Sequence, residues 1–89
     1  QLALGVTSPY YASLGGGAFA MIRMGNAAPE ALDFREVAPI MTHQNFYKDK
    51  DEKAPIIGPL AIGVPGIAAG LFEMHKKYGK LKWAQLFEE

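Results

Sequence analysis

The residues with the clearest chemical potential lie in the segment ALDFREVAP, residues 31–39. Its side chains alternate between apolar and charged, as they do in a strand with one buried face. Leu32 and Phe34 fall on one face, and Asp33 and Arg35 fall on the other. The apolar face is expected to pack on a core, so the charged face belongs to a binding site or to solvent. Judged on residue types alone, a solvated ion pair contributing at most about 1 kcal/mol is the commoner case.

Other residue types that often form sites are scattered along the chain. His43 and His75 are far apart and have no carboxylate at metal-ligand spacing, and the chain has no cysteine. The run Gly15–Gly17 could bind an anion through successive backbone N–H groups, or it could allow a tight approach to another segment. Phosphate loops lead into a helix, whereas this run leads into a predicted strand, which favours the second interpretation. No metal or organic cofactor is predicted.

Composition restricts the class of protein and its partners. Nine basic and nine acidic residues balance to zero net charge, so the chain offers no basic patch for nucleic acid. A single domain of 89 residues buries only about 60 to 65% of its unfolded surface, so it would be marginally stable alone. The chain begins at Gln1, and we expect it to be a piece of a longer polypeptide without an internal domain boundary across residues 1–89.

Two long uncharged stretches, residues 1–22 and 54–72, raise the question of a membrane span. The first contains Pro9 and the glycine run, and the second contains three prolines and four glycines. These residues interrupt helices and would leave backbone groups unpaired in lipid. We therefore predict no membrane span in this segment.

Hydrophobic periodicity predicts the elements that position these residues. Residues 18–24 form a mostly buried strand, and residues 30–37 form its hairpin partner across a turn at Gly25-Asn26. Residues 42–54 are polar and form an exposed loop. A helix begins at Pro65 as its first residue and ends at Gly79, and residues 81–89 form a second, short helix.

Apolar residues at helical spacing predict how these helices pack. The first helix carries an apolar stripe, and the short helix is anchored by three large apolar residues. Three methionines are expected to fill the core. The stripe consists of Ile67, Leu71, Met74 and Tyr78; the anchors are Trp83, Leu86 and Phe87; the methionines are Met21, Met24 and Met74.

Three stretches in a fixed order, GGGAFAMI, LDFREVAP and GVPGIAAGLFEMHKKYGKLKWAQLF, closely resemble the large subunit of gamma-glutamyltranspeptidases. The resemblance runs from about Pro9 to Phe87. It implies an α+β fold in which this chain gives a β-hairpin and covering helices to the α/β/β/α sandwich of an N-terminal-nucleophile hydrolase. It also implies that the intact parent hydrolyses or transfers the gamma-glutamyl group of glutathione and related compounds.

The same resemblance implies that this chain is catalytically incomplete. In the family, a precursor cleaves itself, and the new N-terminal threonine of the small subunit is the nucleophile, with its own amine as base. Thr7 and Thr42 are internal, so no catalytic residue is expected in this chain. Its implied partners are the remaining large-subunit segments, a small subunit with an N-terminal threonine and a small gamma-glutamyl substrate. A periplasmic or extracellular location is suspected on the same basis.

The resemblance also gives Arg35 a role. In the family, the arginine of this motif binds the α-carboxylate of the gamma-glutamyl donor, which suits the bidentate geometry of a guanidinium. Asp33 is expected to support Arg35 by holding its guanidinium, and Glu36 is expected to point away. The sequence differs from its relatives at Tyr10 and Tyr11, where smaller residues and a histidine are usual. These tyrosines put acceptor specificity in doubt.

Two alternative functions stay open at this point. The parent could be a relative on the same fold with another amide substrate, such as a cephalosporin or glutaryl acylase or a poly-gamma-glutamate depolymerase. It could instead be a non-catalytic structural or interaction module in which the chemistry has been lost. A high apolar content in a short chain is compatible with a segment that packs on a partner.

Overall fold

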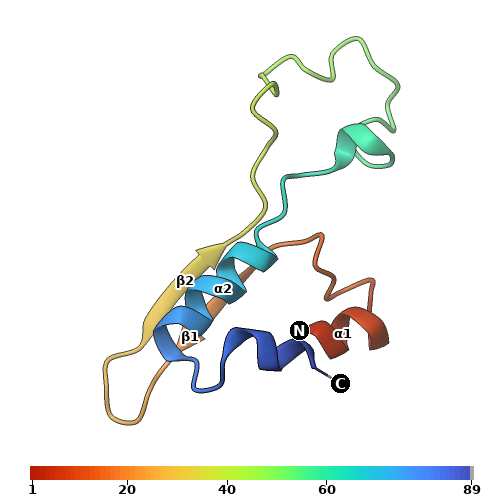
Figure 1. Ribbon diagram of the computed structural model, residues 1–89. Helices are drawn as coiled ribbons and strands as arrows, with labels where there is room; N and C mark the ends of the chain where they lie inside the picture. The colour runs from red at the N-terminus through yellow and green to blue at the C-terminus, as the bar shows by residue number, and fades with distance from the viewer. Residues whose placement is uncertain (89) are drawn as a thin grey trace.

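The computed structural model describes residues 1–88 and has an α+β architecture (Figure 1). A two-stranded antiparallel hairpin packs against a helix, and short helical segments lie near both ends of the chain. In chain order the elements are α1 (Leu2–Thr7), β1 (Ala18–Ile22), β2 (Glu30–Phe34), the 3-10 helix η1 (Pro59–Ala61), α2 (Ile67–Tyr78) and the 3-10 helix η2 (Trp83–Phe87). The predicted hairpin and helices are therefore confirmed as elements.

The hairpin is shorter than the sequence pattern predicts. Its register runs from Ala18 opposite Phe34 to Ile22 opposite Glu30. The next residue on the second strand is Pro29, which has no N–H group to donate to the ladder, so the pairing stops there. Gly25 lies in the turn with a φ of 56°, a conformation that favours glycine.

One face of the hairpin is open to solvent. Burial alternates along β1, and Phe19 and Met21 are 70% and 74% exposed. The prediction of a mostly buried first strand is therefore wrong, and Met21 and Met24 do not fill a core in this chain. A strand covered on only one side buries every second side chain, which explains the difference.

α2 packs closely on β2 and forms the core of the molecule. Ile67 is 4% exposed, and the rest of the predicted stripe, Leu71, Met74 and Tyr78, is half-buried. A Cβ atom on Gly70 would overlap the Phe34 ring, so glycine is needed for this approach. The helix begins at Ile67 and not at Pro65. Its N-cap residue is Gly66, and Pro65 lies one position before it.

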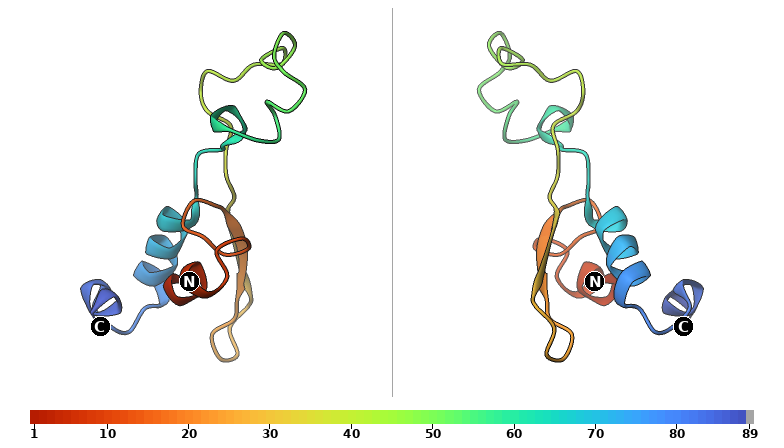
Figure 2. Two further views of the ribbon diagram at one scale, coloured as in Figure 1. Left: turned by 90° about the vertical axis from the view of Figure 1, so that its right-hand side faces the viewer. Right: turned by 90° about the vertical axis from the view of Figure 1, so that its left-hand side faces the viewer.

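Residues 38–62, called the lobe below, project away from the hairpin and α2 (Figures 1 and 2). The lobe consists of turns and η1, with many exposed aliphatic side chains, including Ile40 at 98% exposure. Its two ends are joined where Val37 and Val64 exchange backbone hydrogen bonds of 3.2 and 2.8 Å. Inside the lobe, the Tyr47 hydroxyl donates a hydrogen bond of 2.6 Å to the Leu60 carbonyl.

α1 and η2 lie near the chain termini, on the side of α2 away from the lobe (Figure 1). Trp83 anchors η2, because its ring meets the rings of Phe72 and Phe87 edge-on at centroid distances of 5.4 and 5.2 Å. The other two predicted anchors, Leu86 and Phe87, are 41% and 53% exposed, whereas Trp83 is half-buried. Within residues 1–88, no helix has the length and apolar character needed to cross a bilayer.

Candidate functional site

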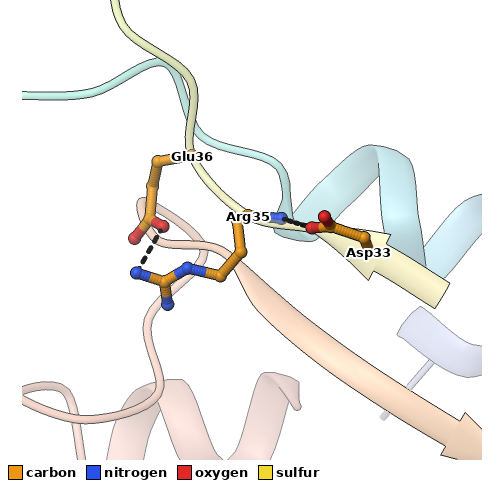
Figure 3. A network of polar contacts seen from close by, with 3 residues as sticks. All are labelled: Asp33, Arg35 and Glu36. Carbon is orange, nitrogen blue, oxygen red and sulfur yellow. Dashed lines mark hydrogen bonds and ion pairs between the residues drawn. The ribbon is translucent and has the colours of Figure 1, made fainter. Parts of the chain in front are cut away.

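Arg35 lies immediately after the last residue of β2, where the chain leaves the hairpin for the lobe (Figure 3). Its side chain is 53% exposed. One guanidinium nitrogen, Nη2, lies 3.2 Å from Oε2 of Glu36, and the guanidinium carbon lies 5.8 Å from the centre of the Phe19 ring. The guanidinium is thus held on one side and keeps N–H groups that face solvent.

Asp33 was expected to hold the guanidinium of Arg35, but it does not contact this group. Its Oδ1 atom instead accepts a hydrogen bond of 3.1 Å from the backbone N–H of Arg35 (Figure 3). The ion partner of Arg35 is Glu36, which was expected to point away. The expectation extended strand alternation to residue 37, but β2 ends at Phe34, and beyond a strand end adjacent side chains need not point to opposite faces.

Glu36 is confined between two glycine-containing segments. Its side chain is 31% exposed. A Cβ atom on Gly63 would lie 3.0 Å from the Glu36 Cβ atom, and one on Gly16 would lie 3.6 Å from its Oε1 atom. The orientation of Glu36 was not predicted from the sequence, because these neighbours are distant along the chain.

The glycine run is used for close packing. The Gly16 carbonyl accepts hydrogen bonds of 3.0 and 3.1 Å from the backbone N–H groups of Gly66 and Ile67 at the start of α2. A Cβ atom on Gly17 would lie 2.6 Å from backbone atoms of Arg35. The run therefore packs against the Arg35 backbone on one side and the start of α2 on the other. This geometry supports the tight-approach interpretation over the anion loop.

A cavity of about 250 Å³ opens beside Arg35 and Glu36. Its other walls come from the N-terminal segment, the glycine run and the start of α2. Tyr10 and Tyr11, on its wall, are 93% and 94% exposed. The full lining is Gln1, Tyr10, Tyr11, Ala12, Ser13, Gly16, Gly17, Ala18, Arg35, Glu36 and Ile67. A small anionic group could enter here and reach the guanidinium.

The two histidines lie outside this cavity. The His75 Nε2 atom is 2.8 Å from the Leu81 carbonyl, and the His43 ring meets Phe46 edge-on at 5.9 Å. In the described part of the chain, no three His, Asp or Glu side chains gather as they would around a metal ion. A larger, apolar cavity of about 590 Å³ lies between α1, α2 and η2. It includes neither Arg35 nor Glu36.

Comparison with known proteins finds the same family at the levels of sequence and structure. The family model for gamma-glutamyltranspeptidase matches residues 1–89. Glutathione hydrolase 2 of Arabidopsis thaliana is 45% identical over 87 residues, which are 98% of this chain and 15% of that protein. This chain therefore spans about 15% of the length of that curated relative.

Two solved structures contain the same arrangement of elements. The gamma-glutamyltranspeptidase of Helicobacter pylori matches 94% of this chain and 25% of its own, with a TM-score of 0.87 and 43% identity. The gamma-glutamyltranspeptidase from Pseudomonas nitroreducens, complexed with L-DON, matches 93% of this chain and 26% of its own, with a TM-score of 0.85 and 39% identity. This chain belongs to the gamma-glutamyltranspeptidase family.

Proposed function

We propose that this chain is part of a glutathione hydrolase or gamma-glutamyltransferase and supplies the arginine that binds the α-carboxylate of the gamma-glutamyl donor. The full enzyme would be an α/β/β/α sandwich, completed by further large-subunit segments and a small subunit. The family match and the names of the relatives support this assignment. The position of Arg35 on the wall of the 250 Å³ cavity supports its role most directly.

The geometry around Arg35 suits carboxylate binding. A guanidinium has five N–H donors in a fixed plane, and one nitrogen, Nη2, lies against Glu36. The other N–H groups of this half-exposed side chain can form two parallel hydrogen bonds with a carboxylate. Glu36 acts as a positioning residue in this proposal, because its ion pair limits the orientations of the guanidinium. Asp33 supports the same side chain indirectly, through the Arg35 backbone N–H.

The chemical step belongs to residues outside this chain. An N-terminal threonine of the small subunit would attack the gamma-glutamyl amide, with its own amine taking the hydroxyl proton. The amine of the leaving group departs with a proton, and the gamma-glutamyl ester that remains on threonine is resolved by water or by an acceptor amine. Arg35 contributes by fixing the donor at its α-carboxylate, so that the amide carbon is held near the nucleophile.

The test is Arg35→Lys in the full-length polypeptide that contains this segment. Lysine keeps the charge but loses the bidentate geometry, so we expect the KM for gamma-glutamyl p-nitroanilide to rise at least about tenfold, equivalent to about 1.4 kcal/mol. Arg23→Lys is the matched control, because Arg23 is also exposed and follows the other strand of the hairpin. An unchanged KM in Arg35→Lys would refute the assignment.

Two further measurements separate the alternative functions. A glutaryl anilide presents a carboxylate to Arg35 but has no α-amino group, so faster turnover of this substrate would indicate an acylase. Intact-mass analysis and N-terminal sequencing of the purified full-length product test whether a subunit beginning with threonine forms. A product that remains uncleaved and inactive would indicate a non-catalytic module.

A further inference from the structure

Gly63 lies beside the ion pair that holds Arg35, although the two segments are far apart along the chain. A Cβ atom added to Gly63 would lie 3.0 Å from the Glu36 Cβ atom and 3.4 Å from the Val37 carbonyl oxygen. Nonbonded carbon atoms prefer separations of about 3.5 to 4.0 Å, so the first of these contacts is too short. Glu36 could make room only by moving its backbone, because its Cβ atom is bonded directly to Cα.

Space, and not backbone conformation, accounts for glycine at this position. The φ of Gly63 lies outside the left-handed region, whereas Gly58 in the lobe has a φ of 102°. Residues other than glycine are disfavoured by a positive φ, and this restriction does not apply at residue 63. The absence of a side chain at Gly63 is therefore explained by the place that Glu36 occupies.

The two ends of the lobe hold Gly63 and Glu36 together. Val37 and Val64 exchange backbone hydrogen bonds of 3.2 and 2.8 Å, and each of them directly follows one of the two residues. These bonds limit how far Glu36 can move away from Gly63. On another side, a Cβ atom on Gly17 would overlap the Glu36 backbone nitrogen, so the glycine run also closes in on this residue. The position of Glu36 is thus fixed by packing beyond the end of β2.

The position of Glu36 matters to the candidate donor site, because its carboxylate is the ion partner of Arg35. Its Oε2 atom lies 3.2 Å from Nη2 of Arg35 (Figure 3), and both residues line the 250 Å³ cavity. A binding group must be held within about 0.5 Å and 10 to 20° of its productive geometry. Relief of the 3.0 Å contact at Gly63 to about 3.5 Å would displace Glu36 by a comparable amount.

We propose that Gly63 is a positioning residue for the donor site. Its missing side chain lets Glu36 lie where it orients the Arg35 guanidinium for the donor's α-carboxylate. Gly63 touches no substrate and acts through Glu36. The proposal rests on the proposed function, in which Arg35 binds the gamma-glutamyl donor, and it adds to that function the segment that returns from the lobe.

The test is Gly63→Ala in the full-length polypeptide that contains this segment. We expect the KM for gamma-glutamyl p-nitroanilide to rise at least about threefold and kcat to change by less than about twofold, because only the placement of the donor is disturbed. Partial unfolding would instead lower the apparent kcat and leave KM unchanged. An unchanged KM in a folded Gly63→Ala protein would overturn the proposal.

Gly5→Ala is the matched control for this variant. It adds the same methyl group in α1, where the nearest atom, the Ala12 carbonyl oxygen, would be at an ordinary contact distance of 3.5 Å. Gly5 lines neither of the two cavities described above. The KM of Gly5→Ala should therefore equal that of the wild type within about 1.5-fold.

A double variant tests whether Gly63 acts through Glu36. Glu36→Gln keeps the Cβ atom, so the overlap with Gly63→Ala remains, but the ion pair is already lost. Two changes that act on one interaction are not additive. We therefore expect the KM of the double variant to stay within about 1.5-fold of the larger single-variant value. A rise equal to the product of the two single effects would overturn the proposal.

Hydrogen exchange in the wild-type full-length protein covers the case in which Gly63→Ala fails to fold. The amides of Val37 and Val64 donate to each other's carbonyls, so they should exchange at least about a hundredfold more slowly than in the denatured protein. Exchange at the denatured rate would overturn the proposal, because Glu36 would then not be held against Gly63.

The kinetics of Arg35→Lys separate this proposal from the proposed function. An unchanged KM in Arg35→Lys would refute the donor site and the role of Gly63 with it. A raised KM in Arg35→Lys together with an unchanged KM in Gly63→Ala would refute only the role of Gly63.

Discussion

The contact between β2 and α2 and the lobe at residues 38–62 use glycine in different ways. In the first region, a Cβ atom on Gly66 or Gly70 would overlap the backbone or ring of Phe34, so these glycines are required for close packing. In the lobe, Gly58 has no neighbour within 4 Å of an added Cβ atom, and its φ of 102° explains the glycine. Glycine marks close packing where β2 meets α2, whereas it marks backbone conformation in the lobe, as it also does at Gly25 in the hairpin turn. Substitutions should therefore have different consequences at the β2–α2 contact and in the lobe.

The largest effect is expected where the hairpin meets α2. Gly70→Val places methyl groups in the space of the Phe34 ring, and we expect the free energy of unfolding to fall by about 3 kcal/mol. Helix propensity alone would slightly favour valine over glycine, so a large loss must come from the overlap. Urea denaturation measures this loss in the free energy of unfolding. Ala69→Val, at the exposed neighbouring position, should cost only about 0.5 kcal/mol, and equal losses would show that the close approach of α2 to Phe34 does not require glycine at position 70.

The next effect is expected at the junction of the two regions, where Glu36 holds Arg35. Glu36→Gln removes the charge but keeps the size of the side chain, and we expect the KM for a gamma-glutamyl donor to rise about threefold with kcat little changed. Because both side chains are partly exposed, the free energy of unfolding should change by less than about 1 kcal/mol. Glu73→Gln, which breaks a pair on α2, is the control. A KM rise as large as that of Arg35→Lys would mean that Glu36 contacts the donor itself.

A local effect on stability is expected inside the lobe. Tyr47→Phe removes the hydrogen bond to the Leu60 carbonyl, worth about 1 kcal/mol. Hydrogen exchange at the Ala61 amide, which donates to the Gly58 carbonyl, should become about fivefold faster. Exchange in α2 should not change, and Tyr10→Phe at a 93% exposed site is the control. Faster exchange in α2 as well would show that the lobe and the hairpin region unfold together.

The smallest effect is expected at the exposed pair of Glu30 and Lys77, which joins the start of β2 to the end of α2. The hydrogen bond from Lys77 lowers the pKa of Glu30 below its ordinary value of 4.5. The hydrogen bond to Glu30 raises the pKa of Lys77 above 10.5. The carboxylate's contribution to stability is therefore present above pH 4.5 and is lost as the pH falls through the lowered pKa. The lysine's contribution is lost as the pH rises through the raised pKa.

Thermal melts across this pH range test the pair. Lys77→Met should melt slightly below the wild type at neutral pH, and the difference should shrink in acid as Glu30 becomes protonated. Lys76→Met is the control, because Lys76 pairs with Glu73 within α2 and does not reach the hairpin. A difference between Lys77→Met and the wild type that does not vary with pH would contradict the assigned ion pair.

The elements that the sequence predicted correctly depend on local chemistry. The alternation of Leu32 and Phe34 with charged residues marks a strand, and Gly25 marks its turn. The apolar stripe beginning at Ile67 marks α2, and Gly79 ends that helix. Each signal involves residues a few positions apart. Its physical basis is either the side-chain period or the turn conformation, and both act within the element itself.

The sequence by itself determined the hairpin, the main helix and Arg35 as the candidate binding residue, because these follow from local periodicity and a recognisable motif. Only the tertiary structure decided that Glu36, and not Asp33, pairs with the guanidinium. It also decided that Gly70 makes room for Phe34 and that α1, α2 and η2 enclose an apolar groove. These features depend on where β2 ends and on how closely segments far apart in the chain approach, and neither is specified by a period of two or of 3.6 residues.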